Sequence, residues 1–368
     1  MHVLHVVGAR PNFMKAAPVI RALHQRSQVR QSLVHTGQHY DANMSDVFFA
    51  QLEMPAPDVN LEVGSGSHAR QTAEIMTRIE PVLLETKPDV VLVYGDVNST
   101  LAAVLVCSKL LIQVGHVEAG LRSFDATMPE EINRIVTDRL ANVLFTPSVD
   151  GDENLLRENV EPGKIHRVGN VMIDSLIRLL PSAMQCPQNG LPERYALVTL
   201  HRPSNVDDPA TLKNILASLL KVSEQLEVVF PVHPRTRQRI GEMGSDAKGL
   251  HLLDPLPYIE FLALQRRAKV VVTDSGGIQE ETTYLGVPCL TLRSNTERPV
   301  TVTAGTNTLV GSDNKKLHSE LIRILEGKGK SGTIPPLWDG HAGERIAEIL
   351  CQLPVNPNES GTPNLAVV

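Results

Sequence analysis

The feature that most constrains the fold of this 368-residue chain is a repeated alternation of short apolar runs with helical patterns. The runs are rich in β-branched residues, which is typical of parallel strands that are buried on both faces and joined by crossover helices. Because a single core stops growing near roughly 250–300 residues, we expect two doubly wound α/β domains rather than one wide sheet. The predicted strands are Val3–Gly8, Gln31–Thr36, Val90–Tyr94, Gln113–Val117, Val143–Pro147 and Ile165–Val168 in the first half, and Ala196–Leu200, Val228–Val232, His251–Asp254, Val270–Thr273, Cys289–Leu292 and Thr308–Val310 in the second.

The boundary between the two domains is expected near residues 169–190. A helical pattern around Met172–Leu180 gives way there to a stretch from Pro181 to Pro192 with the Pro, Asn and Gly content of a linker. We assign residues 1–170 to an N-terminal Rossmann-like domain and residues 171–342 to a C-terminal one. A last helical pattern over residues 343–353 is expected to rejoin the N-terminal domain, and residues 354–368 are expected to be a disordered tail.

Composition excludes some classes of partner. The net charge is −6 and the pI is about 6.1, so the basic footprint of a protein that binds nucleic acid or acidic membranes is missing. The apolar runs fall short of the roughly 18–20 residues that span a bilayer, and the apolar N-terminus lacks the basic region of a signal peptide. We therefore expect a cytoplasmic protein. Its four cysteines are far apart, and we expect them to be reduced packing residues.

Polar residues follow most of the predicted strands. Ligands of open α/β sheets bind beyond the carboxyl ends of the strands, so these residues are the first candidates for a site. Two domains whose strand ends face each other form one cleft between them. The strand-end residues are Arg10, Gln38, His39, Asp41, Asp96, Asn98, Glu118, His201, Arg202, His233, Arg235 and the turn from Asp274 to Gly277.

The sharpest local motif is the segment 269–281, which predicts a strand, a turn of small residues and a helix that ends at Gly286. Free amides at a helix N-terminus attract anions, and glycines let a phosphate approach the backbone. The alternative is an ordinary βα turn whose helix is capped by Asp274 or Ser275. Glu281, one turn into the helix, suits the hydroxyl pair of a ribose; otherwise it lies on a solvated helix face.

The segment after the first strand, residues 8–15, is not a G-x-G-x-x-G sequence, and no Walker A sequence occurs in the chain. It offers two cations, Arg10 and Lys15, that suit a diphosphate, although a lysine alone is more often a surface charge. His116-Val117-Glu118 is similar to the first half of a zinc deaminase motif, but no P-C-x-x-C follows. We expect no metal, and we interpret the other strand-end histidines as hydrogen-bonding groups: His35, His39, His201 and His233.

Acidic residues cluster in the first half. Asp96, Glu118 and the pair Glu130-Glu131 are expected near adjacent strand ends. Carboxylates gathered in a closed cleft repel one another, and burial raises their pKa values, so that one can act as a base while another stays protonated. The alternative for Asp96 and Glu130 is helix capping.

These segments, taken together and in order from residue 8 to about residue 311, resemble the non-hydrolysing UDP-N-acetylglucosamine 2-epimerases. Any one of them alone is a weak signal, but so many ordered blocks are specific. The matching blocks are Gly8-Ala9-Arg10-Pro11, Thr36-Gly37-Gln38-His39-Tyr40-Asp41, Gly95-Asp96-Val97-Asn98-Ser99-Thr100, Gly115-His116-Val117-Glu118-Ala119-Gly120-Leu121-Arg122, Pro129-Glu130-Glu131-Ile132-Asn133-Arg134, Leu200-His201-Arg202, Pro231-Val232-His233-Pro234, Thr273-Asp274-Ser275-Gly276-Gly277-Ile278-Gln279-Glu280-Glu281 and Thr296-Glu297-Arg298-Pro299.

The resemblance implies the two-domain glycosyltransferase-B fold, a homodimer, no cofactor and a reaction at C2 of a UDP-linked 2-acetamido sugar. In that family the C2 proton and UDP are lost to give a 2-acetamidoglucal, and both are then re-added with C2 inverted. Matched by position, Asp96, Glu118 and Glu130 are the implied acid–base carboxylates, and His201 assists departure of the diphosphate. The implied substrate-binding residues are Arg10, Lys15, Ser275, Gly276, Gly277 and Arg298, with Glu281 at the ribose and Phe261 near the uracil.

The resemblance leaves the exact substrate and any activator open. Some bacterial members bind a second UDP-GlcNAc as an activator, but Pro203 stands here where well-known bacterial members have a second arginine. Other relatives act on UDP-2,3-diacetamido-glucuronic acid. There are two competing hypotheses. One is a glycosyltransferase of the same fold, and the other is a regulatory protein that binds a nucleotide sugar without turnover. The residues that resemble the second site are Gln38, His39, Arg70, Gln71, Arg202 and His233.

Overall fold

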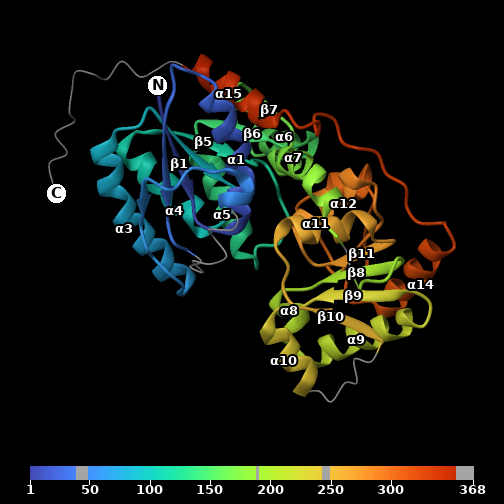
Figure 1. Cartoon of the computed structure of the whole chain (residues 1–368). Helices are drawn as coiled ribbons and strands as arrows, with labels where there is room; N and C mark the ends of the chain where they lie inside the picture. The colour runs from blue at the N-terminus through green and yellow to red at the C-terminus, as the bar shows by residue number, and fades with distance from the viewer. Residues whose placement is uncertain (39–48, 188–189, 243–248, 354–368) are drawn as a thin grey trace.

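The apolar runs form two parallel sheets, each lying between helices, and the two sheets occupy separate lobes (Figure 1). The structure is a computed structural model and describes residues 1–38, 49–187, 190–242 and 249–353. Every strand pairing in it is parallel, as continuous apolar strands with helical crossovers require. The expected fold class is therefore confirmed.

The first sheet has seven strands in the order β3-β2-β1-β4-β5-β6-β7. Its strands are β1 (His2–Val7), β2 (Arg30–His35), β3 (Val59–Asn60), β4 (Val90–Tyr94), β5 (Gln113–Val117), β6 (Val143–Thr146) and β7 (Ile165–Arg167). The helices of this part of the chain are α1 (Arg10–His24), α3 (His68–Thr86), α4 (Asn98–Leu110), α5 (Pro129–Leu140), α6 (Val149–Arg157) and α7 (Val171–Gln185).

The second sheet has six strands in the order β10-β9-β8-β11-β12-β13. Its strands are β8 (Tyr195–Thr199), β9 (Glu227–Pro231), β10 (Leu250–Leu253), β11 (Val270–Thr273), β12 (Cys289–Thr291) and β13 (Asn307–Leu309). The remaining helices are α8 (Pro203–Val206), α9 (Pro209–Ser223), α10 (Pro234–Glu242), α11 (Tyr258–Arg267), α12 (Gly276–Leu285), α13 (Pro299–Thr303), α14 (Asn314–Leu325) and α15 (Ala342–Gln352).

Both sheet orders reverse direction at one point. The reversal lies between β1 and β4 in the first sheet and between β8 and β11 in the second. Crossovers leave in opposite directions there, so the loops beyond the carboxyl ends of these strands open a crevice that binds ligands in doubly wound folds. Each lobe therefore has one preferred place for a site.

Two expectations about the elements need correction. The two-residue strand β3 is not among the predicted strands, because it has a single apolar residue, Val59, and forms by pairing with Val34 and His35 of β2. Helix α7 does not end at Leu180 but continues through Pro181 to Gln185. Its apolar face remains buried beyond the proline, at Ala183, and this burial outweighs the backbone hydrogen bond that the proline removes.

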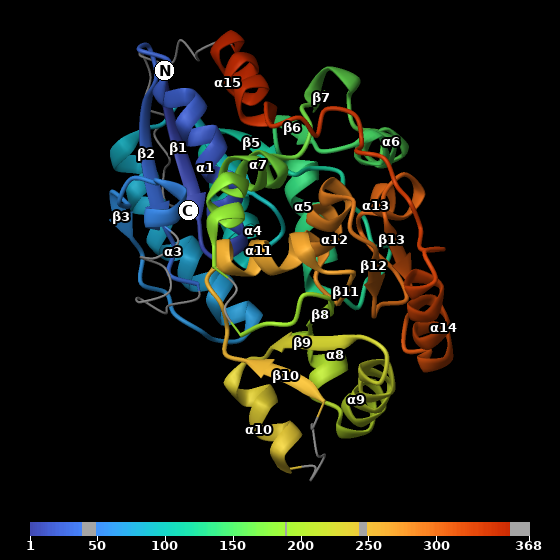
Figure 2. The same cartoon turned by 45° about the vertical axis from the view of Figure 1, so that its right-hand side comes forward.

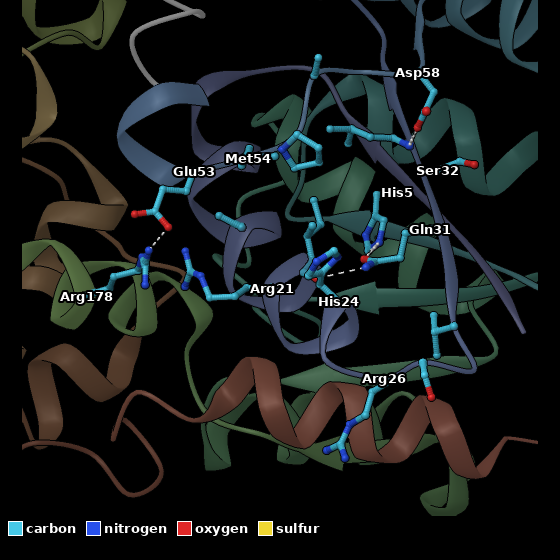
Figure 3. Close-up of a pocket in the computed structure, with 17 residues that line it drawn as sticks. His5, Arg21, His24, Arg26, Gln31, Ser32, Glu53, Met54, Asp58 and Arg178 are labelled. Atoms are coloured by element: carbon cyan, nitrogen blue, oxygen red, sulfur yellow. Dashed lines mark hydrogen bonds and ion pairs between the residues drawn. The ribbon is translucent and has the colours of Figure 1, made fainter.

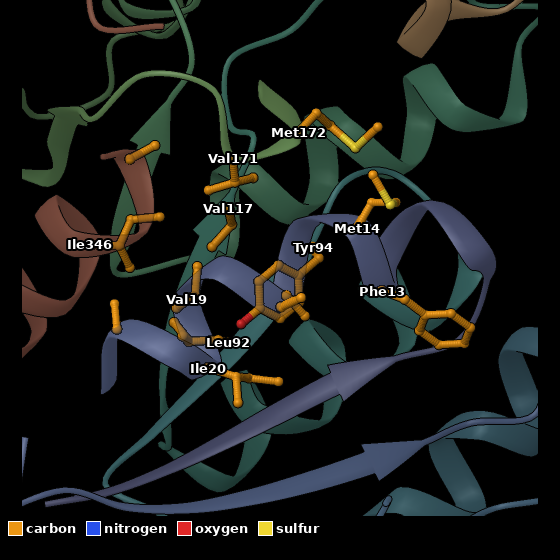
Figure 4. Close-up of a cluster of buried hydrophobic side chains, with 14 of the residues drawn as sticks. Phe13, Met14, Val19, Ile20, Leu92, Tyr94, Val117, Val171, Met172 and Ile346 are labelled. Atoms are coloured by element: carbon orange, nitrogen blue, oxygen red, sulfur yellow. The ribbon is translucent and has the colours of Figure 1, made fainter. Parts of the chain in front are cut away.

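Helices α7 and α15 complete the core of the N-terminal lobe. Figure 4 shows Val171 and Met172 of α7 and Ile346 of α15 beside side chains of α1 and of the strands, such as Tyr94. Helix α15 lies against α1, as Figure 2 also shows, and α7 contacts α11 and α12 of the other lobe as well. The chain thus returns to its first lobe at its C-terminal end.

The segment that leads back to α15 is anchored on the N-terminal lobe. Trp338 is 2% exposed, and its indole Nε1 donates a hydrogen bond to the carbonyl of Pro147 at 3.0 Å. At the start of α15, the Gly343 amide donates to the Asp174 carboxylate of α7 at 2.8 Å.

Among the described residues, no helix has both the length and the apolarity needed to cross a bilayer.

Candidate active site

A cavity of about 460 Å³ lies between the lobes, beyond the carboxyl ends of the strands at the two reversal points. Arg10 follows β1 and Asp96 follows β4; His201 follows β8 and Ser275 follows β11. The strand ends therefore face one another, as the sequence predicts. The predicted site residues that line this cavity are Arg10, Lys15, Asp96, Glu130, His201, Arg202, Ser275, Gly276, Gly277, Glu281 and Arg298.

A larger cavity, of about 830 Å³, lies on the N-terminal lobe alone (Figure 3). It is bordered by α1, the first residues of β2 and the segment 53–58, away from the carboxyl ends of the strands. Its charged groups already have partners: Arg178 pairs with Glu53, and Arg21 donates to the carbonyl of Leu52 at 3.2 Å. Burial lowers the pKa of His5 to about 4, so this histidine is neutral. The cavity lacks the predicted site residues, and we take the smaller cleft as the active site.

Glu118 lies on a strained turn directly after β5. Its φ is +76°, in the left-handed region that residues other than glycine rarely adopt. The amides of Glu118 and Ala119 both donate to the carbonyl of Phe145, at 3.1 and 3.0 Å, and hold the turn against β6. Gly120 follows with φ +81°, and a Cβ there would meet the carbonyl of Gly151 at 2.4 Å. The surrounding chain thus imposes the orientation of the Glu118 carboxylate.

Two cations flank the Glu118 carboxylate. The Lys15 ammonium pairs with Oε2, and Nη2 of Arg298 lies 3.1 Å from Oε1. Burial by itself would raise the pKa of Glu118, but the charges of Lys15 and Arg298 outweigh burial and hold the pKa below its ordinary value. Glu118 is therefore ionised at neutral pH. Lys15, expected at the phosphates, is 4% exposed and engaged with this carboxylate.

Asp96 is held by an arginine that is itself fixed in place. Nη1 of Arg134 lies 2.5 Å from Oδ2 of Asp96, and the same guanidinium donates to Glu131 at 2.9 and 2.6 Å. Glu131 in turn accepts the amides of Ser123 and Phe124, at 3.0 and 2.8 Å. The Asp96 side chain stays 23% exposed, so it is fixed in orientation but still open to the cleft.

The capping alternatives for these carboxylates are wrong. Val97 is the N-cap of α4 and Met128 that of α5, and neither helix has a side-chain cap. Asp96 lies outside α4, and Glu130 is the second residue of α5 and lines the cleft. Both carboxylates are therefore available for another role.

Asp274 orients His201 instead of capping α12. Its Oδ1 lies 2.8 Å from Nδ1 of His201, and its carboxylate also accepts the amide of Arg202 at 2.9 Å and the side-chain amide of Asn205 at 3.0 Å. Burial would raise the pKa of Asp274, but these donors, His201 foremost, keep the pKa below its ordinary value. The ionised Asp274 carboxylate accepts a hydrogen bond from Nδ1–H of His201, so the ring presents Nε2 to a ligand.

The N-terminus of α12 forms the floor of the cleft. Ser275 is its N-cap and makes no side-chain cap, so its first amides are not satisfied by a cap, and Gly286 ends the helix with φ +70° as expected. Arg298 lies directly against this turn, because a Cβ on Gly276 would come within 2.5 Å of its Nη1. Helix amides and a guanidinium thus converge where a diphosphate is expected.

We expect Gly276→Ala to weaken UDP binding at least about tenfold, because the new Cβ displaces Arg298 or the diphosphate. The matched variant is Gly277→Ala, whose Cβ would meet only Cε of Met172, at the ordinary distance of 3.6 Å. Isothermal titration calorimetry with UDP compares the two. Equal loss of affinity in both variants would contradict the close approach at Gly276.

Glu281 is buried in the same helix, with 2% of its surface exposed. Its Oε1 accepts a hydrogen bond from the Tyr258 hydroxyl at 2.9 Å, and burial raises its pKa to about 7 despite that bond. Phe261, expected near the uracil, is partly buried against a neighbouring apolar cluster that includes Tyr195 and Leu264, and it is not among the described residues that line the cavity.

The described residues contain no group of three or more His, Cys, Asp or Glu side chains placed to hold a metal ion. His116, in the segment similar to a deaminase motif, has partners for both ring nitrogens. Nδ1 lies 2.6 Å from Asp138 and Nε2 lies 2.9 Å from the carbonyl of Gly95. His116 thus supports the turn after β4.

Comparison with known proteins decides the family. The family model for UDP-N-acetylglucosamine 2-epimerase matches residues 21–351. The chain belongs to this family. The UDP-N-acetylglucosamine 2-epimerase of Methanocaldococcus jannaschii is 44% identical over 359 residues, which cover 94% of this chain and 97% of the relative. The UDP-2,3-diacetamido-2,3-dideoxy-D-glucuronate 2-epimerase of Pseudomonas aeruginosa is 42% identical over 356 residues, which cover 96% of this chain and 100% of the relative.

The fold agrees with solved structures of the UDP-N-acetylglucosamine 2-epimerase family. The crystal structure of the Methanocaldococcus jannaschii enzyme in complex with UDP-GlcNAc and UDP matches with a TM-score of 0.88 at 44% identity, over 95% of this chain and 99% of that one. The family resemblance and the glycosyltransferase-B fold expected from the sequence are confirmed.

Two residues expected at a second site of this family member are buried in its N-terminal lobe and joined to the active site. Nε2 of Gln71 donates to the carbonyl of Gln38 at 3.0 Å, and Oε1 of Gln71 accepts from Asn98 at 2.8 Å. Asn133 donates to Asn98 at 3.3 Å and to the backbone carbonyl of Asp96 at 2.8 Å. This chain of hydrogen bonds connects Gln38 to the loop that carries Asp96.

The other second-site residues are dispersed. Arg202 lines the cleft, and its Nε donates to the carbonyl of Asp274 at 3.1 Å. Arg70 and His233 are exposed, and His39 lies outside the described residues. Of these residues, as far as the structure describes them, Arg202 lines the cleft, and Gln38 and Gln71 are connected to it through Asn98 and Asn133; the six do not form one group.

Three residues that line the cleft of this family member, and one ion-pair partner beside it, have no separate role in the sequence prediction: Arg134, Glu280 and Glu297, and the partner Arg293. Nη2 of Arg293 pairs with Oε2 of Glu297 at 2.6 Å, and Glu297 also pairs with Arg298. Each stands in or beside a matched block, next to or near a predicted residue. The sequence could have indicated two of them by their position: Glu297 is next to the predicted cation Arg298, and Arg134 lies one helical turn after the predicted carboxylate Glu130.

Proposed function

We propose that this chain is a UDP-N-acetylglucosamine 2-epimerase that interconverts UDP-GlcNAc and UDP-ManNAc. The observation that carries the proposal is that Asp96 and Glu130 line one cleft together with the phosphate-binding turn of α12. The ionised Glu118 lies directly behind this lining, paired with Lys15 and Arg298. The M. jannaschii relative, whose structure contains UDP-GlcNAc and UDP, supports it.

In the proposed reaction the diphosphate leaves C1 as the C2 proton is removed, and both return with C2 inverted. Because C2–H is a weak acid, the carboxylate that removes the proton must be held in place and shielded from water. Asp96, Glu118 and Glu130 form the proposed acid–base set, with Asp96 and Glu118 each fixed by a paired cation.

The departing diphosphate needs positive charge and hydrogen-bond donors. The proposed donors are Arg10, Arg298 and the amides from Ser275 to Gly277. Lys15 also lines the cleft, where its ammonium holds the Glu118 carboxylate. In its imidazolium form, held by the Asp274 carboxylate at Nδ1, His201 is placed to donate the Nε2 proton to the leaving oxygen and to take it back when UDP is re-added. Glu281 is the proposed ligand of the ribose, and Phe261 supports the uracil region.

Incubation with UDP-GlcNAc in D2O tests this proposal. We expect deuterium to enter C2 while the manno epimer appears, both followed by NMR. A C2 proton that stays unexchanged, with UDP-GlcNAc saturating and the protein folded, would exclude this substrate.

A second substrate is favoured by one observation, the 42% identity to the Pseudomonas aeruginosa enzyme named for UDP-2,3-diacetamido-2,3-dideoxy-D-glucuronate. The same D2O assay with that nucleotide sugar distinguishes the two, since the preferred substrate exchanges faster at equal concentration.

We also propose a cytoplasmic homodimer, and a domain division at residue 170 with residues 343–353 joined to the first domain. The packing of α15 on α1 supports that last point.

A further inference from the structure

Glu280 is a buried carboxyl of the cleft that has no part in the proposed reaction. It lies on α12, is 1% exposed and lines the cavity. Its Oε1 is 3.0 Å from Nε of Arg298. Its Oε2 is buried and has no hydrogen-bond partner among the described residues. An ionised carboxylate with a buried, unpartnered oxygen is unfavourable, whereas a protonated carboxyl avoids most of that cost.

Arg298 is the group that Glu280 faces, and its guanidinium is shared. Nη2 lies 3.1 Å from Glu118 and Nη1 pairs with Glu297, while Nε lies 3.0 Å from Glu280 but makes no hydrogen bond with any described residue. The same Nη1 lies against Gly276 in the phosphate-binding turn. A change of charge at Glu280 therefore acts on the arginine that is expected to hold the diphosphate.

The charges of the cleft favour a neutral Glu280. Within the part of the chain that the structure describes, the Asp, Glu, Lys and Arg side chains that line the cavity, with their ion-pair partners, comprise seven carboxylates and six cations, so one negative charge is in excess when all are ionised. The carboxylates are Asp96, Glu118, Glu130, Glu131, Glu280, Glu281 and Glu297, and the cations are Arg10, Lys15, Arg134, Arg202, Arg293 and Arg298.

The charged groups that face Glu280 come from three neighbouring elements. They are Arg298 beside α13, Glu118 beyond β5 and Lys15 of α1; on its own helix, Glu281 is bonded to Tyr258 of α11. Burial is the main influence, and with the charge of Glu118 it raises the pKa of Glu280 to about 7 against the opposing effect of Arg298. A ligand that brings further negative charge to Arg298 strengthens this tendency.

We propose, on the basis of the proposed function, that Glu280 holds a proton when the diphosphate is bound and thereby positions Arg298 for the departure and return of UDP. Neutral Glu280 leaves the guanidinium to Glu118 and the diphosphate. Ionised Glu280 competes with the diphosphate for the same guanidinium. Glu280 is thus a positioning residue, and the proton that it takes up on ligand binding comes from solvent.

Proton uptake on UDP binding tests this directly. Calorimetric titration of the wild-type protein with UDP at pH 8, in two buffers with different ionisation enthalpies, gives the number of protons taken up. We expect uptake of up to about one proton per UDP in the wild type and its loss in Glu280→Gln. The titration of UDP itself is common to all variants and cancels in the comparison. No uptake by the wild type, or equal uptake by Glu280→Gln, overturns the proposal.

The pH profile separates positioning from a merely structural role. For the wild type we expect kcat/KM to fall above pH 7, by about tenfold per pH unit once Glu280 is ionised. Glu280→Gln, which remains neutral, is expected to lose this alkaline decline. Glu280→Asp keeps a titrating carboxyl but withdraws it from Arg298, so the decline persists at a several-fold lower kcat/KM. Glu260→Gln, an exposed carboxylate on α11, is the matched control and should keep the wild-type profile.

The two proposals fail separately. If the D2O assay shows no exchange at C2, the proposed function fails while proton uptake with UDP still reports on Glu280. If exchange occurs and Glu280→Gln retains the wild-type alkaline decline, the role of Glu280 fails and the function stands. Thermal unfolding of each variant checks that it is folded. The proton uptake of the wild type is measured without any variant, so it tests the proposal even if a variant fails to fold.

Discussion

Asp96→Asn is expected to lower kcat by about 10²–10⁴-fold, the usual contribution of a positioned general acid or base. Asparagine has nearly the same shape and can still accept a hydrogen bond from Nη1 of Arg134, which lies 2.5 Å from the carboxylate. The geometry of the cleft is therefore kept while the ability to take up a proton is lost. Conversion of UDP-GlcNAc, and calorimetric binding of UDP, measure the two properties separately.

UDP affinity should change little in Asp96→Asn, since the phosphate-binding turn lies on the other lobe. The matched control is Asp254→Asn, which alters a carboxylate with 91% of its side chain exposed and paired with Arg237. This control should keep wild-type turnover. Loss of UDP binding with turnover retained in Asp96→Asn would falsify the assignment of Asp96 to the chemical step.

Glu118→Gln is expected to have the largest combined effect, with turnover abolished and the free energy of unfolding lowered by about 3–5 kcal/mol. The variant leaves the Lys15 ammonium, which is 4% exposed, without the carboxylate that now neutralises it. Denaturant unfolding measures the loss. Because the pKa of Glu118 is lowered in the folded state, the advantage of the wild type is present above pH 4.5 and declines as the pH falls further.

An exposed ion pair of the same chemistry provides the control for Glu118→Gln. Glu53 pairs with Arg178, but 68% of its side chain is exposed. Glu53→Gln should therefore change the free energy of unfolding by less than about 1 kcal/mol. Similar losses in both variants would show that the burial of the Lys15–Glu118 pair does not matter.

The sequence predicts the strands well because each buried parallel strand needs a continuous apolar run, and such runs end at turns that the sequence also marks. The exception, β3, has one apolar residue and depends on its neighbour β2. The end of α7 is missed for a related reason: Pro181 indicates a break, while the buried face around Ala183 decides the outcome. Both misses are cases in which contacts distant in sequence override a local signal.

The candidate site also has features that local sequence predicts and features that depend on contacts distant in sequence. The strand-end positions of Arg10, Asp96, His201 and Ser275 follow from topology, and topology follows from the pattern of runs. The pairing of Lys15 with Glu118 does not, because these residues are 103 positions apart and their contact exists only after folding. A motif gives the chemical types in a cleft, but it does not say which charges neutralise one another.

The return of α15 to α1 also bears on how the protein is made. The core of the N-terminal lobe contains Ala342, Ile346 and Leu350 together with Phe13 and Val19. On the ribosome, the residues of the first sheet therefore emerge long before the last part of their own core. The N-terminal lobe can therefore complete its packing only after the second lobe has been synthesised, although its strands are made first.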